Sequence, residues 1–101
     1  MSSSKLVRDK IPQIIADSDK KCSHYICDFS EYKTRLYDKM LEEVSEFIED
    51  PCVEEAGDIY EVFLAILKSH EINFPDVVFA AADKKEKRGG FDKGIILLNV
   101  T

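Results

Sequence analysis

The sequence contains two pairs of carboxylates whose members lie three residues apart, Glu43 with Glu46 and Glu55 with Asp58. A three-residue step on an α-helix leaves two side chains about 60° apart, so each pair presents its carboxylates on one face. Oxygen ligands of this kind suit Mg²⁺ or Mn²⁺, which typically hold one or two protein carboxylates, waters and substrate phosphates. The spacing therefore predicts a divalent-cation site, and the alternative is a solvated acidic helix face.

Two helices joined by a tight connection are predicted to position these pairs. Residues 30–49 carry apolar side chains along one helical stripe, and Ser30 is the expected N-cap. A second stripe covers residues 53–70, and we expect Asp50 to cap this helix and Pro51 to occupy its first position. An antiparallel hairpin with so short a connection brings both acid pairs near its closed end, so four carboxylates can converge.

The other segments complete a mainly α single domain over residues 1–101. A short helix is expected over residues 12–16, and Pro75 is expected to start a third helix that ends near residue 87. Residues 22–29 and the apolar tail 93–100 are expected to pair as a small β element from the N- and C-terminal segments, or the tail is a packed arm. The expected fold is a helical hairpin plus a third helix with this small β element.

Composition excludes several classes of protein. The chain has 101 residues, of which 45% are hydrophobic, as expected for one ordinary soluble domain. Its longest apolar run, residues 62–67, is far shorter than the ~20 residues needed to cross a bilayer. The N-terminus carries no apolar stretch typical of a secretory signal, so a cytoplasmic location is expected.

The acidic residues are concentrated in the middle of the chain. Residues 31–61 hold eleven acids against three bases, whereas both flanks are mildly basic. Duplex nucleic acid requires a dominant basic face, so this distribution argues against it, and it suits a metal ion carrying a polyphosphate. The three cysteines favour reduced thiols, and a zinc site at Cys22, His24 and Cys27 is disfavoured because a fourth ligand is missing.

Three sequence blocks resemble a known family. The stretch from Glu42 to Asp58 contains E-E-V-S-E followed by E-E-A-G-D, which is similar to the acid signature of the all-α nucleoside triphosphate pyrophosphohydrolases. This is the MazG-like and phosphoribosyl-ATP pyrophosphohydrolase-like group. The opening K-L-V-R-D-K-I-P at residues 5–12 and the R-G-G-F at residues 88–91 are similar to those of a short subgroup within it.

The resemblance implies that Glu43, Glu46, Glu55 and Asp58 bind Mg²⁺, with Mn²⁺ as a substitute. It also implies that water attacks the α-phosphorus of a nucleotide substrate, which gives a monophosphate and pyrophosphate. This chemistry fits the residues, because metal ions neutralise developing charge and activate water. Among the carboxylates, Glu46, together with Glu43, is the expected catalytic group that positions the water. Removal of non-standard or surplus triphosphates is the expected role.

Basic residues near both ends are candidates for binding the phosphates. Lys84 and Arg88 stand four residues apart on one helical face, and both can contact phosphate. Three further candidates lie near the N-terminus: Lys5, Arg8 and Lys10. The alternative for Lys84 and Arg88 is a helix end at which cations favour the dipole, and for the other three it is a solvated tail.

Assembly into a homodimer or homotetramer is expected, because the second predicted helix is apolar over more of its circumference than one neighbour covers. Two other functions remain open at this point. One is a helical dimerisation or adaptor module whose acids serve solubility and partner choice. The other is phosphoribosyl-ATP hydrolysis, which is disfavoured because the resemblance is to the shorter subgroup.

Overall fold

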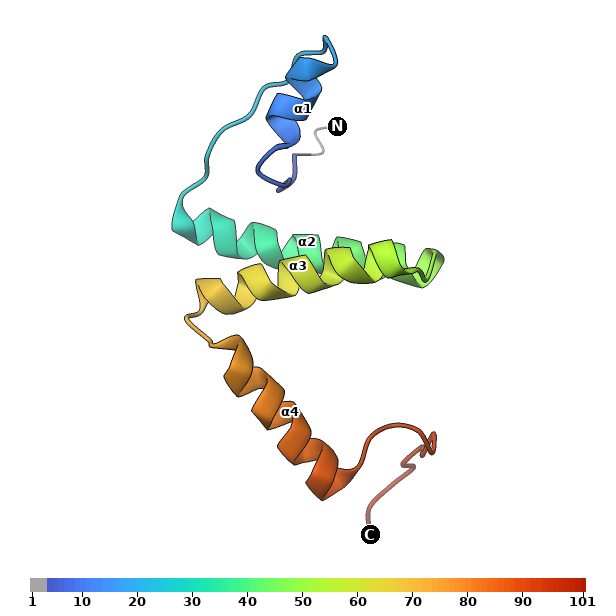
Figure 1. Ribbon diagram of the computed structural model, residues 1–101. Helices are drawn as coiled ribbons and strands as arrows, with labels where there is room; N and C mark the ends of the chain where they lie inside the picture. The colour runs from blue at the N-terminus through green and yellow to red at the C-terminus, as the bar shows by residue number, and fades with distance from the viewer. Residues whose placement is uncertain (1–3) are drawn as a thin grey trace.

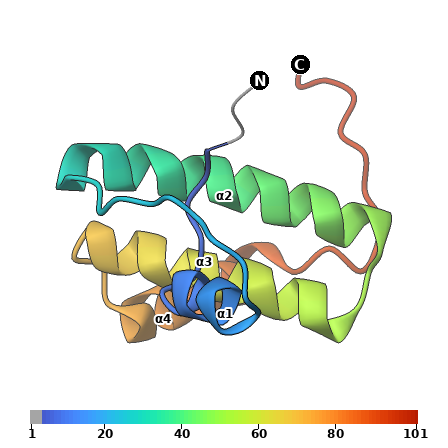
Figure 2. The same cartoon turned by 90° about the horizontal axis from the view of Figure 1, so that it is seen from above.

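The computed structural model describes residues 4–101, and these contain four α-helices and no β-strand (Figure 1). The helices are α1 (Ile11–Asp17), α2 (Phe29–Glu49), α3 (Val53–Ser69) and α4 (Phe74–Arg88). Helices α2 and α3 pack against each other as an antiparallel hairpin, and Figure 2 shows them side by side from above. The predicted hairpin, the third long helix and the short N-terminal helix are therefore confirmed.

Helix α2 begins two residues earlier than expected and has a different cap. Asp28 is the N-cap, and its side-chain oxygen accepts a hydrogen bond of 2.8 Å from the backbone N–H of Glu31. Asp28 has the extended backbone that an N-cap adopts, whereas Ser30 already lies in the first helical turn. The prediction of Ser30 as the cap was wrong, because an earlier residue has an equally suitable side chain.

The hairpin connection also differs from the prediction by two residues. Asp50 ends α2, and its backbone N–H donates to the carbonyl of Glu46 at 3.0 Å. Helix α3 starts at Val53, with an extended Cys52 as its N-cap. Asp50 therefore ends the first helix and does not cap the second. Pro51 lies between the helices, and because a proline disfavours helical backbone angles in the residue before it, the first helix stops here.

Helix α4 leaves the hairpin on the side opposite to α1 (Figure 1). Pro75 lies in its first turn, as predicted, and three cations lie in its last turn, where they favour the helix dipole: Lys85, Lys87 and Arg88. Gly89 ends the helix at φ 84°, a left-handed conformation that glycine adopts without steric cost.

The predicted β element is absent from residues 4–101. Residues 22–29 are irregular up to the start of α2, and residues 93–100 are irregular throughout. The two segments lie on opposite sides of the hairpin, so neither offers the other a backbone ladder (Figure 1). Their apolar, β-branched composition was compatible with strands, but a strand forms only where a partner is within reach.

Little of the chain is buried. Among the apolar residues that the structure describes, Leu36 at 2% and Leu67 at 7% exposure are the two buried ones, and both lie in the hairpin. The radius of gyration is 18.2 Å, against about 13 Å for a compact domain of this length. None of the helices within residues 4–101 has the length and apolar character required to cross a membrane.

Candidate metal centre

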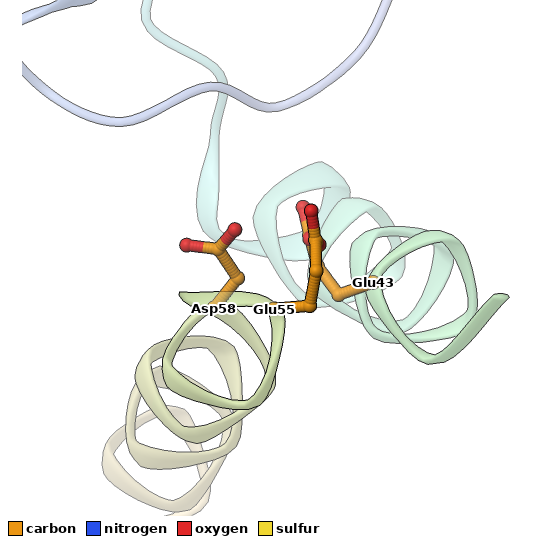
Figure 3. A group of neighbouring side chains, drawn as sticks. All are labelled: Glu43, Glu55 and Asp58. Atoms are coloured by element: carbon orange, nitrogen blue, oxygen red, sulfur yellow. The ribbon is translucent and has the colours of Figure 1, made fainter. Parts of the chain in front are cut away.

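Three carboxylates from the two hairpin helices converge on one side of the hairpin. Glu43 of α2 and Glu55 and Asp58 of α3 each place a carboxylate oxygen within 4.8 Å of the others. Figure 3 shows the three side chains pointing to the same side of the helix pair. These are three of the four acids that the sequence spacing selected.

Helical periodicity explains why Glu43 is buried. Glu43 follows the buried Leu36 by seven residues, which is within about 20° of two full turns, so both side chains face α3. Only 6% of Glu43 is exposed. Glu55 and Asp58 are partly exposed in the first two turns of α3, and their three-residue separation places them on the face that meets Glu43.

Glu43 and Glu55 each keep one buried oxygen without a hydrogen-bond donor. The other oxygen of Glu43 lies 3.3 Å from Nζ of Lys39, while Oε2 of Glu43 and Oε2 of Glu55 have no partner. A buried acceptor without a donor is costly, and a buried carboxylate is more so. A bound cation removes this cost, so the residues fit a divalent metal with oxygen ligands.

The pKa values of these acids reflect the same shortage of donors. Burial raises the pKa of Glu43, Lys39 opposes the shift, and the neighbouring charges of Glu46 and Asp58 reinforce it. Burial likewise raises the pKa of Glu55, and the charges of Asp58 and Glu43 add to the effect. Desolvation and like-charge repulsion both penalise the ionised forms, and both are relieved when a cation binds.

Cations of the N-terminal segment contact this acidic face. Nη2 of Arg8 lies 2.7 Å from Oδ1 of Asp58, and Nζ of Lys5 lies 3.1 Å from Oε1 of Glu42. Lys10 is the exposed N-cap residue of α1. The structure therefore places Arg8 against Asp58 of the acid cluster and Lys5 against the neighbouring Glu42, so both cations contact carboxylates.

Lys39 is a site residue that the sequence reasoning missed. Its ammonium lies 3.0 Å from Glu42 and 3.3 Å from Glu43, and its side chain is 16% exposed. Burial lowers the pKa of Lys39, but the hydrogen bonds to Glu42 and Glu43 outweigh it and raise the pKa overall. The signal was present, because Lys39 precedes these acids by three and four residues on one helix.

Three other predicted site residues do not belong to the cluster of converging carboxylates: Glu46, Lys84 and Arg88. Glu46 is exposed and is not among the three carboxylates that converge, although its spacing places it on the same side of α2 as Glu43; the way α2 is rotated against α3 buries Glu43 and leaves Glu46 exposed. Lys84 and Arg88 are exposed on α4, on the far side of the hairpin (Figure 1). Within one chain, the structure does not bring these two cations to the acids.

The disfavoured zinc site finds no support in residues 4–101. The three cysteines are free thiols. Within this part of the chain, the group of side chains with metal-ligand geometry is the acidic one, and it includes no cysteine or histidine. A cation at this protein is therefore expected to be one that prefers oxygen ligands.

Comparison with known proteins assigns no family. No family model matches the chain, and neither a curated protein nor a solved structure is significantly similar to it. The functional interpretation therefore depends on the chemistry and the geometry of the acid cluster.

Proposed function

We propose that this protein is a Mg²⁺-dependent pyrophosphohydrolase that cleaves a nucleoside triphosphate, or a related nucleotide, at the α-phosphorus. The products are a nucleoside monophosphate and pyrophosphate. The observation that carries the proposal is the buried carboxylate of Glu43, whose unpartnered oxygen lies in a cluster with Glu55 and Asp58. A solvated acidic face offers no reason to bury such an oxygen, whereas a cation site does.

Glu43, Glu55 and Asp58 are the residues that would hold the metal. When bound, Mg²⁺ supplies charge neutralisation at the phosphates and lowers the pKa of coordinated water. Glu46 is exposed, yet it is close enough for its charge to raise the pKa of Glu43. This position suits a general base that is not committed to the metal, so Glu46 is the proposed residue that orients the attacking water.

Basic side chains at the edge of the cluster provide the contacts to the substrate. The Arg8 side chain is 57% exposed, and its guanidinium contacts Asp58. The guanidinium therefore lies at the edge of the cluster, where it can contact an anion that is held there. Guanidinium groups bind phosphate oxygens in bidentate fashion, which orients the polyphosphate as well as attracting it. Lys39 instead holds Glu42 and Glu43 in place, which makes it a positioning residue.

The test is a product screen over nucleoside triphosphates and phosphoribosyl-ATP in the presence of Mg²⁺. The assay resolves pyrophosphate from orthophosphate by ion chromatography. We expect pyrophosphate and a monophosphate in equal amounts, and no turnover when EDTA is present. Release of orthophosphate would indicate a different bond cleavage, and no turnover with any nucleotide would contradict the proposal.

The competing function is a helical adaptor without catalysis, and the large exposed apolar surface of the chain favours it. This function predicts no nucleotide turnover and no preference for Mg²⁺ over monovalent salt. It leaves the buried, unpartnered oxygen of Glu43 without an explanation. We therefore rank it second.

A further inference from the structure

The last eleven residues form an apolar segment that the chain itself does not cover. We call residues 91–101 the C-terminal arm; its six large apolar side chains are between 76% and 98% exposed: Phe91, Ile95, Ile96, Leu97, Leu98 and Val100. Soluble monomers rarely leave so many contiguous apolar side chains in water. The arm therefore requires a surface to pack on.

The hairpin and α4 also expose large apolar side chains, on which the arm of another chain can pack. Ile48 near the end of α2 is 71% exposed, Val53 at the start of α3 is 83% exposed, and Phe79 of α4 is 74% exposed. Leu41 of α2 is also 71% exposed. Large apolar side chains at helix positions normally lie against a neighbour, so these positions indicate that a packing partner covers them.

The exposed area is too large for a complete monomer. The chain exposes 9130 Å², whereas a compact monomer of 11.5 kDa is expected to expose about 5800 Å². The excess of roughly 3300 Å² is several times the ~800 Å² that each partner buries in a stable interface. An excess of this size is typical of the interface of an obligate assembly.

The charge distribution indicates what covers this surface. Residues 31–61 carry eleven acids and three bases, whereas residues 84–93 carry five bases and two acids. Helix α4 directs this basic segment away from its own hairpin (Figure 1). Two copies in opposite orientation can each place the basic segment near the acidic hairpin of the other, so one surface is complementary to itself.

We propose that a second copy of this chain covers the exposed apolar surface, and that each copy packs its C-terminal arm on the hairpin of the other. The proposal depends on area, exposure and charge, and it is independent of the catalytic proposal. In this assembly the two copies share one apolar core, which explains why a chain with 45% hydrophobic residues buries so few of them by itself.

The experiment is sedimentation equilibrium on the full-length chain. We expect the wild type to have twice the mass of the 11.5 kDa chain at about 10 µM. The double variant Ile96→Asp, Leu98→Asp should raise the dissociation constant by about a hundredfold or more, because two buried aliphatic side chains become charged. The matched control, Asn99→Asp with Thr101→Asp, adds the same charge to the same arm and should leave the dissociation constant within about threefold.

A second measurement uses the wild type alone, so it remains informative if the double variant fails to fold. The backbone amides of residues 95–100 should be protected from hydrogen exchange at high protein concentration and should lose this protection on dilution. A monomeric wild type would overturn the proposal, whether its arm stays free or binds vesicles of neutral phospholipid. A dimer whose arm amides exchange freely, or one that the double variant leaves intact, would overturn the arm's role.

Discussion

The acidic face of the hairpin and the C-terminal third of the chain are organised in opposite ways. On the acidic face, ion pairs link distant parts of the sequence, as between Arg8 and Asp58 or Lys5 and Glu42. Within residues 70–101 there is one ion pair, Lys87 with Asp83, and it joins two positions of the same helix. The first region thus shows long-range organisation, whereas the second is mainly local helical structure, and its aromatic contacts with the hairpin are at its beginning, where His70 meets Tyr37 and Phe74 meets Tyr60.

This difference shows that one chain contains a complete acid cluster but an incomplete apolar core. A single hairpin is enough to place Glu43, Glu55 and Asp58 together, because both helices are in direct contact. The apolar core, by contrast, is not complete within one chain, because α4 and the C-terminal arm expose their large apolar side chains. Metal binding is therefore expected to depend mainly on the hairpin, and stability mainly on assembly.

The largest expected effect comes from neutralising one carboxylate of the cluster. Glu43→Gln and Asp58→Asn each remove a ligand charge with little change in shape, and each should lower the rate of pyrophosphate release by about a hundredfold or more. The metal-free Glu43→Gln protein should be slightly more stable than the wild type, because a buried charge is lost.

Glu49→Gln is the matched control, because Glu49 is an exposed acid at the end of the same helix. Its turnover should remain within about twofold of the wild type. Equal, mild losses in all three variants would indicate a diffuse acidic surface and would remove the contrast between an organised site and the rest of the hairpin.

A second prediction concerns the thermal stability of the full-length protein. A cation that binds only the folded state stabilises it by mass action, by about 1.4 kcal/mol at ten times its dissociation constant. For a domain of this size that free energy raises the melting temperature by several degrees. Calorimetric titration with MgCl₂ against NaCl at matched ionic strength measures the effect, and identical shifts with the two salts would exclude a specific site.

A third prediction is a pH dependence of the metal-free protein. Burial raises the folded-state pKa of Glu43 and of Glu55 above the ordinary value of 4.5. Their contribution to stability is therefore complete below pH 4.5 and is lost as the pH rises through the raised values. Glu42 acts in the opposite sense: hydrogen bonds from Lys39 and Lys5 lower its pKa, so its contribution is lost as the pH falls below 4.5.

Urea unfolding of the wild type and of Glu43→Gln isolates the contribution of Glu43. The stability advantage of the variant should grow between pH 4.5 and about pH 7 in EDTA, because only the wild type then carries the buried charge. Saturating Mg²⁺ should reverse the order, since the wild type alone has the full ligand set. An advantage that does not change with pH would mean that Glu43 is well solvated.

The sequence predicts the parts of this molecule that depend on neighbouring residues along the chain. The apolar stripes predict α2 and α3, and the three-residue spacing places Glu55 and Asp58 on one face. The β element was wrong because a strand requires a partner that is distant in sequence, and apolar composition alone does not place one. The exposed position of Glu46 was equally hidden, because it depends on how α2 is rotated against α3.

The smallest expected effect is at the contact between the N-terminal segment and the cluster. The ion pair of Arg8 and Asp58 is partly exposed, at 57% and 39% of the two side chains, so Arg8→Gln should lower metal-free stability by about 0.5 kcal/mol or less. The guanidinium repels an arriving divalent cation and occupies an oxygen of Asp58, so the same change should tighten Mg²⁺ binding severalfold in isothermal titration.

Lys10→Gln is the control for this prediction, because Lys10 lies two residues further on and forms no ion pair within residues 4–101. It removes the same charge from the same segment and should leave Mg²⁺ affinity nearly unchanged. Equal tightening in both variants would show that the basic segment acts only through its overall charge. Weaker Mg²⁺ binding in Arg8→Gln alone would instead show that Arg8 orients Asp58 for the cation, in which case the N-terminal segment belongs to the organised region as a positioning element.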